Sequence, residues 1–468
     1  MTAVVRAESS LAARIDAAPP GETVTAFVAV DGGLLAGSPL APFATPDSLW
    51  GRFVADVVAG VAGPAVVTPD DVVRVVRARR GRTVDEVADE CAATFRGTTA
   101  SWLHPEVWRL AVRHAGWGHR VVLVSAATPL DVAPLAEALG ADDVVATRLS
   151  YGGPDGDVVA GLGSPVCTGP DAAAAVVGWA DDHDVDLGQA FVYAPADDRA
   201  LLDLAAHPVV VGGPDGVHPA LPVAPRGAVP PVEAIGGTVG FYGGFLSATL
   251  AAMGSGALRL SRHHAINLAG SLGSELALGI AGVDVEVSGA EHLWSHRPAV
   301  FVFNHQSALD PIVTMTMLRH DFTGVAKAEA RSMPLFGQLF VLADVAFVER
   351  GNTRQAKEAL EPAVEKIRRG MSLLMAPEGT RSPTPRPGRF KKGAFHIAMQ
   401  AGVPMVPIVL ENAGELMWRH DATVRPGTVR ATVLPPIDTA AWSVDTLDDH
   451  VAHVRGLFLE TLGLREKQ

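Results

Sequence analysis

The sequence predicts two α/β domains, and three observations point to this class. At 468 residues, the chain is longer than one hydrophobic core usually supports. Short β-like runs alternate with helical stretches in both halves, which is typical of parallel sheets with crossover helices. A proline-rich segment at 213–231 separates the two alternating regions, and we place the interdomain linker at 213–233.

Composition limits the kinds of site and compartment. Hydrophobic residues make up 48% of the chain and the mean hydropathy is +0.23, which fits a globular protein with extra apolar surface. The two cysteines, Cys91 and Cys167, provide neither a disulfide framework nor the spacing of metal ligands. We therefore predict no metal site and a reducing compartment. No charged segment followed by an apolar run opens the chain, so we expect no export signal.

Charge divides unevenly between the two halves. Residues 1–222 contain 14 arginines, no lysine and 28 acidic residues, a net charge of −14. Of the chain's 38 basic and 51 acidic residues, 24 and 23 remain for the back half, a net charge of +1. An acidic front half argues against nucleic acid and anionic membrane as its partners. The back half can approach a negatively charged surface without that repulsion.

The front domain is expected over residues 23–212. Residues 1–22 are expected to form an untethered lead-in. Apolar runs predict strands at 24–30, 121–124, 191–193 and 209–211. Residues 36–118 lack a clear central strand and are interpreted as a mostly helical cap inserted after the first strand.

Two apolar stretches within residues 234–283 precede the back domain. Residues 234–258 contain no charged residue, and residues 265–283 contain only Glu275. About 20 apolar residues suffice to cross a bilayer, so spanning helices, interfacial helices and buried core helices are all open interpretations. One crossing would separate the two domains without a signal, and two crossings would oppose the positive-inside rule. We favour helices lying in the membrane interface, with Arg259 and Arg262 among the headgroups.

The α/β alternation resumes in the back domain, which we place at 284–468. A helix is predicted at 355–369. Strands are predicted at 283–287, 299–303, 324–326, 345–348, 373–375, 405–410 and 429–434.

A histidine and a carboxylate follow the strand predicted at 299–303. His305 and Asp310 are five positions apart, and Pro311 predicts that a helix begins there with Asp310 as its N-cap. The chain therefore turns between them, and the carboxylate can reach back to the imidazole. A carboxylate on one ring nitrogen fixes the tautomer and leaves the other nitrogen as a base. Taken alone, the same spacing would also fit a helix cap beside an ordinary loop histidine.

Anion-binding groups follow two other strands of the same domain. Residues 378–381 (Glu-Gly-Thr-Arg) offer backbone N–H groups, the Thr380 hydroxyl and the Arg381 guanidinium. Arg350 follows the strand at 345–348. Arginine is suited to bidentate phosphate binding, and ligands of open α/β sheets bind at the carboxyl ends of strands. These groups are therefore expected to converge with His305, although each arginine could instead be a surface charge.

With these residues in place, the stretch 300–410 resembles the glycerophospholipid acyltransferase superfamily, most closely the bacterial lysophosphatidate acyltransferases. The resemblance extends over about 236–440. The usual Glu-Leu of the second motif is Glu329-Ala330 here. The four motifs occur in the family's order, as residues 304–310; Lys327, Glu329, Pro334, Gly337 and 347–350; residues 377–382; and residues 403–407.

The resemblance implies a role for each motif. His305 would be the general base and Asp310 its partner. The fourth motif would line the acyl site. The third motif would hold the acceptor's phosphate through Glu378, Gly379 and Arg381. All residues implied to bind the acceptor substrate are Lys327, Arg350, Glu378, Gly379, Thr380 and Arg381.

The reaction implied by this resemblance is acyl transfer. A fatty acyl group would pass from acyl-CoA or acyl carrier protein to the free hydroxyl of 1-acylglycerol-3-phosphate, giving phosphatidate in phospholipid biosynthesis. No cofactor is implied beyond the thioester co-substrate, and the expected location is the cytoplasmic side of the cell membrane, peripheral or monotopic. Alternatives are another acceptor, such as glycerol 3-phosphate or a different lysophospholipid, and a catalytically silent membrane scaffold.

The front domain resembles the haloacid-dehalogenase phosphatases of the phosphoserine-phosphatase type. That family has Asp-x-Asp-Gly-Thr after its first strand. Here Asp31 stands at the second aspartate, but Ala29 occupies the nucleophile's position and Gly33 the threonine's. Ser125 matches the family's phosphate-binding serine.

Other positions of this resemblance have also lost their chemistry. Pro195 stands where the resemblance expects a metal-binding aspartate, and Ala172 lies closest to the expected lysine. Covalent phosphoryl transfer needs a carboxylate nucleophile and a carboxylate Mg²⁺ site. We therefore predict a Rossmann-like pseudophosphatase domain, with an active phosphatase as the disfavoured alternative.

Overall fold

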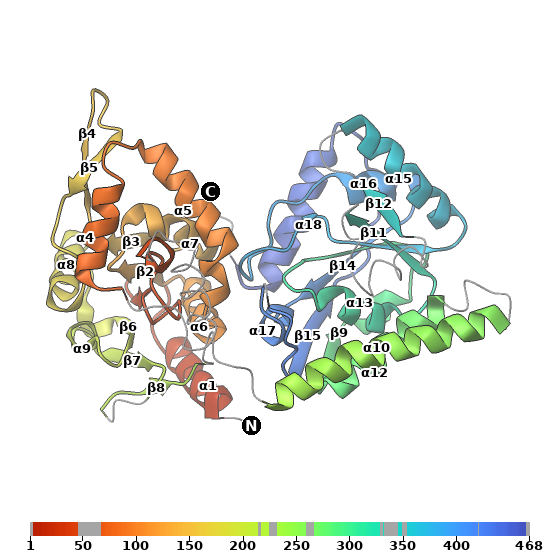
Figure 1. The fold of residues 1–468 in the computed structure, drawn as a ribbon, viewed down its shortest axis with the longest axis horizontal. Coiled ribbons are helices and arrows are strands. Elements are labelled where there is room, and N and C mark those ends of the chain that lie inside the picture. Colours follow the sequence, from red (N-terminus) through yellow and green to blue (C-terminus); the bar gives the residue numbers. More distant parts are fainter. Residues whose placement is uncertain are drawn as a thin grey trace. The chain divides into compact units, whose positions relative to one another are not determined.

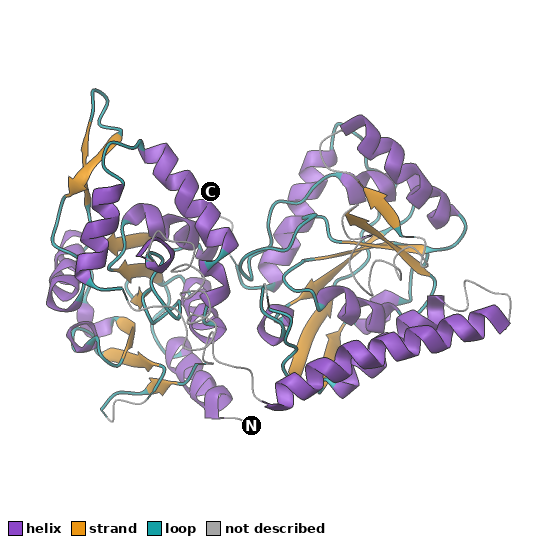
Figure 2. Ribbon diagram, viewed as in Figure 1, coloured by secondary structure: helices purple, strands orange, loops and turns teal. Residues whose placement is uncertain are grey.

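The computed structural model describes residues 3–44, 67–213, 217–223, 232–258, 266–327, 331, 345–348, 353–419 and 421–464. The chain forms two compact units, Met1–Val229 with Gly463–Gln468, and Pro230–Leu462 (Figure 1). The boundary lies inside the linker predicted at 213–233. Each unit contains its own sheet flanked by helices, as the predicted mixed α/β class requires (Figure 2).

The front unit is built on a six-stranded sheet in the order β3-β2-β1-β6-β7-β8. Each neighbouring pair is parallel. The four predicted strands are present, whereas β3 and β8 were not predicted. The strands are β1 (Thr25–Ala29), β2 (Arg120–Ser125), β3 (Asp143–Ala146), β6 (Phe191–Pro195), β7 (His207–Val211) and β8 (Ala220–Leu221).

Helices cover both faces of this sheet. Residues of α8 and α9 pack on the face that carries Phe27 and Val122, while α6 packs on the opposite face against Phe191 and Tyr193. The helices are α1 (Ala3–Asp16), α2 (Ala41–Ala44), α4 (Pro69–Ala78), α5 (Val84–Gly97), α6 (Pro105–Gly116), α7 (Pro129–Leu139), α8 (Gly169–Asp182) and α9 (Arg199–Leu202), with 3₁₀ turns at Thr99–Trp102 and Leu187–Gln189.

The helical segment predicted as a cap at 36–118 divides in two. Helix α6 contacts β1 and β2 and therefore belongs to the layer on the sheet. Helices α4 and α5 instead adjoin an unpredicted hairpin, β4 (Leu149–Gly152) and β5 (Val158–Leu162), through backbone hydrogen bonds from Gly81 and Val84. Residues 45–66 of the predicted cap lie outside the described residues.

The prediction of an untethered lead-in at 1–22 is wrong. Residues 3–16 form helix α1, whose Leu11 and Ile15 are buried. Glu8 forms a bidentate pair with Arg109 of α6, at 2.6 and 2.8 Å. Asp16 likewise pairs with Arg113 of the same helix. The segment is thus docked by apolar burial and by ion pairs.

The back unit contains a seven-stranded sheet in the order β12-β11-β13-β10-β14-β15-β9. The pair β14–β15 is antiparallel and the other neighbours are parallel. All seven predicted strands are present, as β9 (Val283–Ser288), β10 (Val300–Phe303), β11 (Phe322–Lys327), β12 (Ala346–Val348), β13 (Ser372–Met375), β14 (Met405–Leu410) and β15 (Gly427–Val433).

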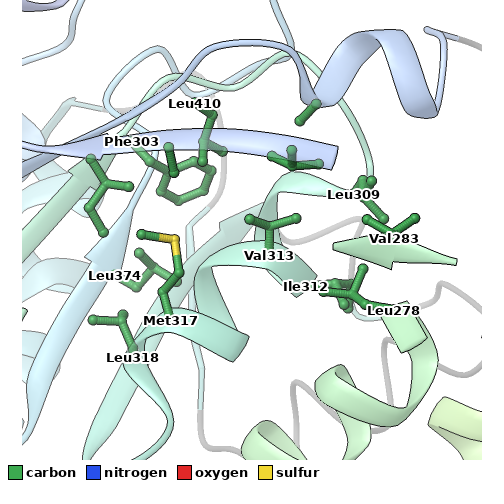
Figure 3. Packing of buried hydrophobic residues seen from close by; sticks show 14 of the residues in the cluster. Leu278, Val283, Phe303, Leu309, Ile312, Val313, Met317, Leu318, Leu374 and Leu410 are labelled. Atoms are coloured by element: carbon green, nitrogen blue, oxygen red, sulfur yellow. The ribbon is translucent and has the colours of Figure 1, made fainter. Parts of the chain in front are cut away.

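The central strand β10 separates two hydrophobic cores because successive side chains point to opposite faces. Phe301 and Phe303 join the core beneath α13, and Figure 3 shows Val313 and Met317 of that helix among these residues. The alternate residues of β10 join the second core. The helices are α13 (Asp310–Leu318), α15 (Thr353–Arg368), α16 (Gly393–Ala401), α17 (Ala413–Leu416) and α18 (Leu447–Thr461), with a 3₁₀ turn at Ala290–Leu293.

Within the apolar stretch at 234–283, the described residues form helices of the back unit as far as Ile280. Helix α10 (Val232–Leu258) packs on α12 (Ser274–Ile280) and on the π-helical turn Ala269–Gly273. Within the described residues, the segment Ala234–Ser255 is the one helix long and apolar enough to cross a membrane. Arg259 and Arg262, expected among the headgroups, lie outside the described residues.

A buried histidine network joins three segments of the front unit. His119 Nε2 lies 3.0 Å from the carbonyl oxygen of Pro19 and must donate to it, which leaves His119 Nδ1 as an acceptor. His114 Nδ1 donates to that nitrogen over 2.8 Å, and its Nε2 accepts from the Tyr193 hydroxyl over 2.9 Å. The network is satisfied only while both imidazoles are neutral. Burial, with the neighbouring His119, lowers the pKa of His114 to about 3.

The front unit is expected to become less stable as pH falls, because of the protonation of His114. The unfolded chain takes up this proton as pH drops below 6.5, whereas the folded unit resists it down to about 3. The histidine's stabilising contribution is therefore complete above that upper value and declines below it, by up to roughly 1.4 kcal/mol per pH unit. Hydrogen exchange of peptides from β1 and β6, corrected for intrinsic pH dependence, measures the change.

The matched comparison is His114→Phe against His183→Phe, an exposed histidine of the same unit. The first substitution is expected to reduce the slope of protection against pH, and the second to leave the wild-type slope. An unchanged slope in His114→Phe would contradict the proton linkage, whatever the variant's overall stability.

Candidate active site

Two loops leave the back sheet at the same edge. Strands β10 and β13 are adjacent and parallel, with Val302 opposite Met375, so residues 304–310 and 376–382 both begin at the carboxyl edge. Strand β14 flanks β10 on the other side. Asn304, which is fully buried, links the β10 and β14 ends by donating to the carbonyl oxygen of Leu410 and accepting from its N–H, at 2.8 and 2.7 Å. The loop that carries His305 therefore starts from a fixed position.

The imidazole of His305 contacts the carboxylate of Asp310. The Nδ1 atom lies 2.8 Å from Asp310 Oδ2, and the side chains are 22% and 0% exposed. The same oxygen accepts the backbone N–H groups of Gln306 and Ser307, each over 2.7 Å. Asp310 is the first residue of α13 rather than the N-cap expected from the sequence. Its carboxylate thus closes the 305–310 loop.

This arrangement sets the chemistry of His305. A carboxylate oxygen only accepts, so Nδ1 carries the proton that is shared with Asp310. The neutral imidazole then presents Nε2 as an acceptor, which is the form a general base requires. The partial exposure of the ring leaves it accessible, whereas the carboxylate that orients it is enclosed.

Glu378 holds the same loop from the other side. Its Oε1 accepts the backbone N–H of His305 over 2.7 Å. Its Oε2 accepts the Ser382 hydroxyl, and the N–H of Gly388 over 2.8 Å. Burial raises the pKa of Glu378, while these three hydrogen bonds oppose the increase. The carboxylate is therefore occupied with positioning two loops, which does not match the phosphate-holding role that the sequence resemblance implies.

The remaining residues of the 378–382 loop lie close to the base. Ser382 N–H donates to the carbonyl oxygen of His305 over 2.7 Å, so Arg381 is one residue from this contact and is half-buried. Thr380 is exposed. Gly379 has φ of +67°, and a Cβ there would lie 2.8 Å from Lys391 Nζ. The backbone turn at 379 thus requires glycine and brings a lysine against the loop.

The second-motif residues are only partly placed. Lys327 ends β11 in register with Val348 of β12, which puts its backbone at the carboxyl edge of the sheet. The side chain of Lys327 lies outside the described residues, as do Glu329, Pro334, Gly337 and Arg350. Their predicted part in acceptor binding stays a prediction.

Two contributors to this region were not predicted from the sequence. Gly388 donates to Glu378, and Arg419 donates from Nη1 to the carbonyl oxygen of Arg381. Gly388 has no signal in the sequence, since any residue supplies an N–H. Arg419 lies outside the motifs, so only the folded chain brings it to Arg381. Within the described part of the chain, no cluster of three histidine, cysteine or acidic side chains could hold a metal.

At the corresponding edge of the front sheet, the position where the resemblance expects a nucleophile carries no carboxylate. Position 29, at the end of β1, carries only the methyl group of Ala29. Asp31 accepts the Ser125 hydroxyl over 2.6 Å and the Ala126 N–H over 3.0 Å. Pro195 lies beside Gly32, 3.5 Å from where a Cβ would stand. The surviving aspartate therefore joins the ends of β1 and β2, and a proline ring lies where the resemblance expects a carboxylate.

Comparison with known proteins agrees with the two-unit organisation. A family profile described as acyltransferase matches residues 284–411, and one described as haloacid dehalogenase-like hydrolase matches residues 52–205. A 1-acyl-sn-glycerol-3-phosphate acyltransferase of Limnanthes alba is 36% identical over 203 residues, covering 43% of this chain and 71% of that protein. The alpha form of that enzyme from Homo sapiens is 35% identical, covering 37% and 62%.

Two solved structures are also similar. The 1-acyl-sn-glycerophosphate acyltransferase of Thermotoga maritima has a TM-score of 0.41 and 25% identity, covering 51% of this chain and 99% of its own. A phosphoserine phosphatase without ligand has a TM-score of 0.29 and 15% identity, covering 41% and 86%.

Substituting Glu378 by glutamine is expected to slow acyl transfer. The amide would replace one of the two accepting oxygens by an NH₂ group that faces a backbone N–H donor, so the 305–310 loop and its histidine would shift. Because misplacement of a reacting group and disruption of a buried polar network are both costly, kcat should fall on the order of 10- to 100-fold. Steady-state kinetics measures this change.

The control for that substitution is Glu365→Gln, which removes an exposed carboxylate on α15 that pairs with Arg369. This control should retain wild-type kcat. If Glu378→Gln also retains it, Glu378 has no positioning role.

Proposed function

The chain belongs to the acyltransferase family of the 1-acyl-sn-glycerol-3-phosphate acyltransferases, and we propose that it acylates 1-acylglycerol-3-phosphate to give phosphatidate. The proposed donor is acyl-CoA or acyl carrier protein, and the proposed pathway is phospholipid biosynthesis. The contact between His305 Nδ1 and Asp310, which leaves Nε2 free as a base, is the observation that carries this proposal.

The proposed step is direct transfer between the two substrates. His305 Nε2 takes the proton from the acceptor's free hydroxyl as that oxygen attacks the thioester carbonyl carbon. The new ester C–O bond forms, the C–S bond breaks, and the thiolate leaves with the proton returned by the imidazolium. The buried carboxylate of Asp310 stabilises the positive charge that develops on the ring.

Acceptor binding is assigned to the 379–381 loop. The phosphate would be held by the backbone N–H groups of Gly379 and Thr380, the Thr380 hydroxyl and the Arg381 guanidinium. Lys327 and Arg350 would contribute as well. A phosphate held at this loop lies close to the base because Ser382 is hydrogen-bonded to His305. Holding both reactants in place supplies the rest of the acceleration.

Removing the base is expected to abolish most of the activity. His305→Ala should lower transfer of a labelled acyl group from acyl-CoA to 1-acylglycerol-3-phosphate by roughly 10²- to 10⁴-fold. His296→Ala, which removes an exposed histidine of the same unit, should retain activity. Comparable transfer by His305→Ala and wild type would remove His305 from the mechanism.

The same assay separates the alternative functions. A silent scaffold would give no transfer with the wild-type protein, and a different acceptor preference would appear as faster acylation of glycerol 3-phosphate or of another lysophospholipid.

The front unit is proposed to be a pseudophosphatase because of Ala29 and Pro195. Release of phosphate from phosphoserine by the wild-type protein would contradict that assignment.

Membrane contact is proposed for the exposed face of α10, at the cytoplasmic side of the cell membrane. Val239 and Leu250 are 69% and 58% exposed on this helix, while Phe241 and Phe245 of its other face are buried. Apolar side chains left in water on an otherwise packed helix favour transfer into lipid. Further exposed apolar residues of this face and of the adjacent helix are Ile235, Leu246, Met253, Leu272, Leu276 and Ile280.

Charges placed on this face should weaken membrane binding. The double substitution Val239→Glu, Leu250→Glu is expected to release the protein from sedimenting phospholipid vesicles, whereas Val444→Glu, at an exposed apolar residue elsewhere, should not. Sedimentation equal to wild type would contradict the interfacial assignment. Retention of the wild-type protein after alkaline carbonate extraction would instead favour a spanning helix.

A further inference from the structure

Arg419 lies directly beside Arg381. Its Nη1 donates to the carbonyl oxygen of Arg381, and both residues are half-buried. Burial lowers the pKa of Arg419, and the positive charge of Arg381 lowers it further. The guanidinium of Arg419 is therefore held against the backbone of Arg381 at the edge of the 378–382 loop, although 38 positions separate the two residues in the chain.

Both arginines are attached to the loop that holds the base. Arg381 precedes Ser382, whose N–H donates to the carbonyl oxygen of His305 over 2.7 Å. Arg419 follows Met417 by two residues, and the Met417 carbonyl oxygen accepts the Ser307 hydroxyl over 2.8 Å. The backbone around each arginine is thus fixed to the 305–310 loop, which carries His305.

Like charges held together in a partly buried place repel each other, and a dianion between them reverses the sign of the interaction. Each guanidinium presents a planar fork of N–H donors that matches phosphate oxygens. We propose that Arg419 is a second guanidinium ligand of the acceptor's phosphate, acting beside Arg381. This inference rests on the proposed function and adds a residue to its substrate site.

A phosphate monoester is present in both substrates of the proposed reaction when the donor is acyl-CoA. In the lysophospholipid acceptor, the phosphate is separated from the reacting hydroxyl by only a few bonds of glycerol. In acyl-CoA, the ribose phosphate lies at the far end of the long pantetheine arm from the thioester. Since the two arginines are fixed to the loop that carries the base, the acceptor is the source that the geometry favours.

Direct binding tests the inference independently of turnover. Full-length wild type and Arg419→Gln are titrated calorimetrically with a short-chain 1-acylglycerol-3-phosphate and, separately, with a non-hydrolysable acyl-CoA analogue. Loss of one charge-assisted phosphate contact should weaken acceptor binding on the order of 10- to 100-fold. Binding of the acyl-CoA analogue should be unchanged, which also shows that the variant is folded.

Two further comparisons distinguish direct contact of Arg419 with the phosphate from an indirect effect through Arg381. In the Arg381→Gln background, Arg419→Gln should still weaken acceptor binding if Arg419 touches the phosphate, whereas a residue that only positions Arg381 would have no further effect. Arg419→Lys keeps the charge and should bind more tightly than Arg419→Gln. The matched control is Arg430→Gln, since Arg430 is exposed on β15 and pairs with Glu411.

The outcomes distinguish the inference from the proposed function. Unchanged acceptor binding in Arg419→Gln, a selective loss of acyl-CoA binding, or no effect in the Arg381→Gln background overturns the role of Arg419. Wild-type binding of the acceptor without acyl transfer overturns the proposed function, while a binding loss in Arg419→Gln still supports the arginine pair. A wild-type protein that does not bind the acceptor overturns both.

Discussion

The position of His305 depends on two buried carboxylates. Asp310 holds the ring and Glu378 holds the backbone N–H of the same residue. Burying a carboxylate is unfavourable unless it accepts hydrogen bonds. Here each carboxylate accepts three hydrogen bonds, and most of their donors are backbone N–H groups of the two loops. These hydrogen bonds offset part of the cost of burial, and the same set of interactions both closes the two loops and orients the imidazole.

The base and the proposed anion site lie on adjacent loops. The Asp310 carboxylate contacts the imidazole on one loop, and the acceptor proposed here would bring a phosphate to the other. Under that proposal, the phosphate would need cations beside it. Arg381 would supply such a cation, since it follows the 378–380 turn in the chain. The tight turn, with glycine at 379, would thus separate the base from the proposed anion site.

Strand positions and the His305–Asp310 contact could be predicted from local sequence, because an apolar run and a five-residue spacing are properties of one segment. The contacts of Glu378 could not, since its partners lie 73 and 10 positions away and include backbone groups with no side-chain signature. Helix α1 was missed for a similar reason. Its attachment uses Glu8 and Arg109, 101 positions apart, and only a few of its residues are buried. Strand β8, with two residues, is too short for a periodic pattern.

The loop after β14 connects the proposed lipid-facing helix with the chemistry. Thr238 of α10 accepts the N–H of Val424 over 2.9 Å, and the same loop is bound at Met417 by Ser307 of the base loop. A contact that orients α10 on lipid would thus also orient the segment that contains Arg419. An acceptor whose acyl chain stays in the membrane can offer only its headgroup to the enzyme. Under the proposed function, a cationic site fixed to the same backbone as this helix would set the depth at which that headgroup is bound, so the hydroxyl beside the phosphate would reach His305 without the chain leaving lipid.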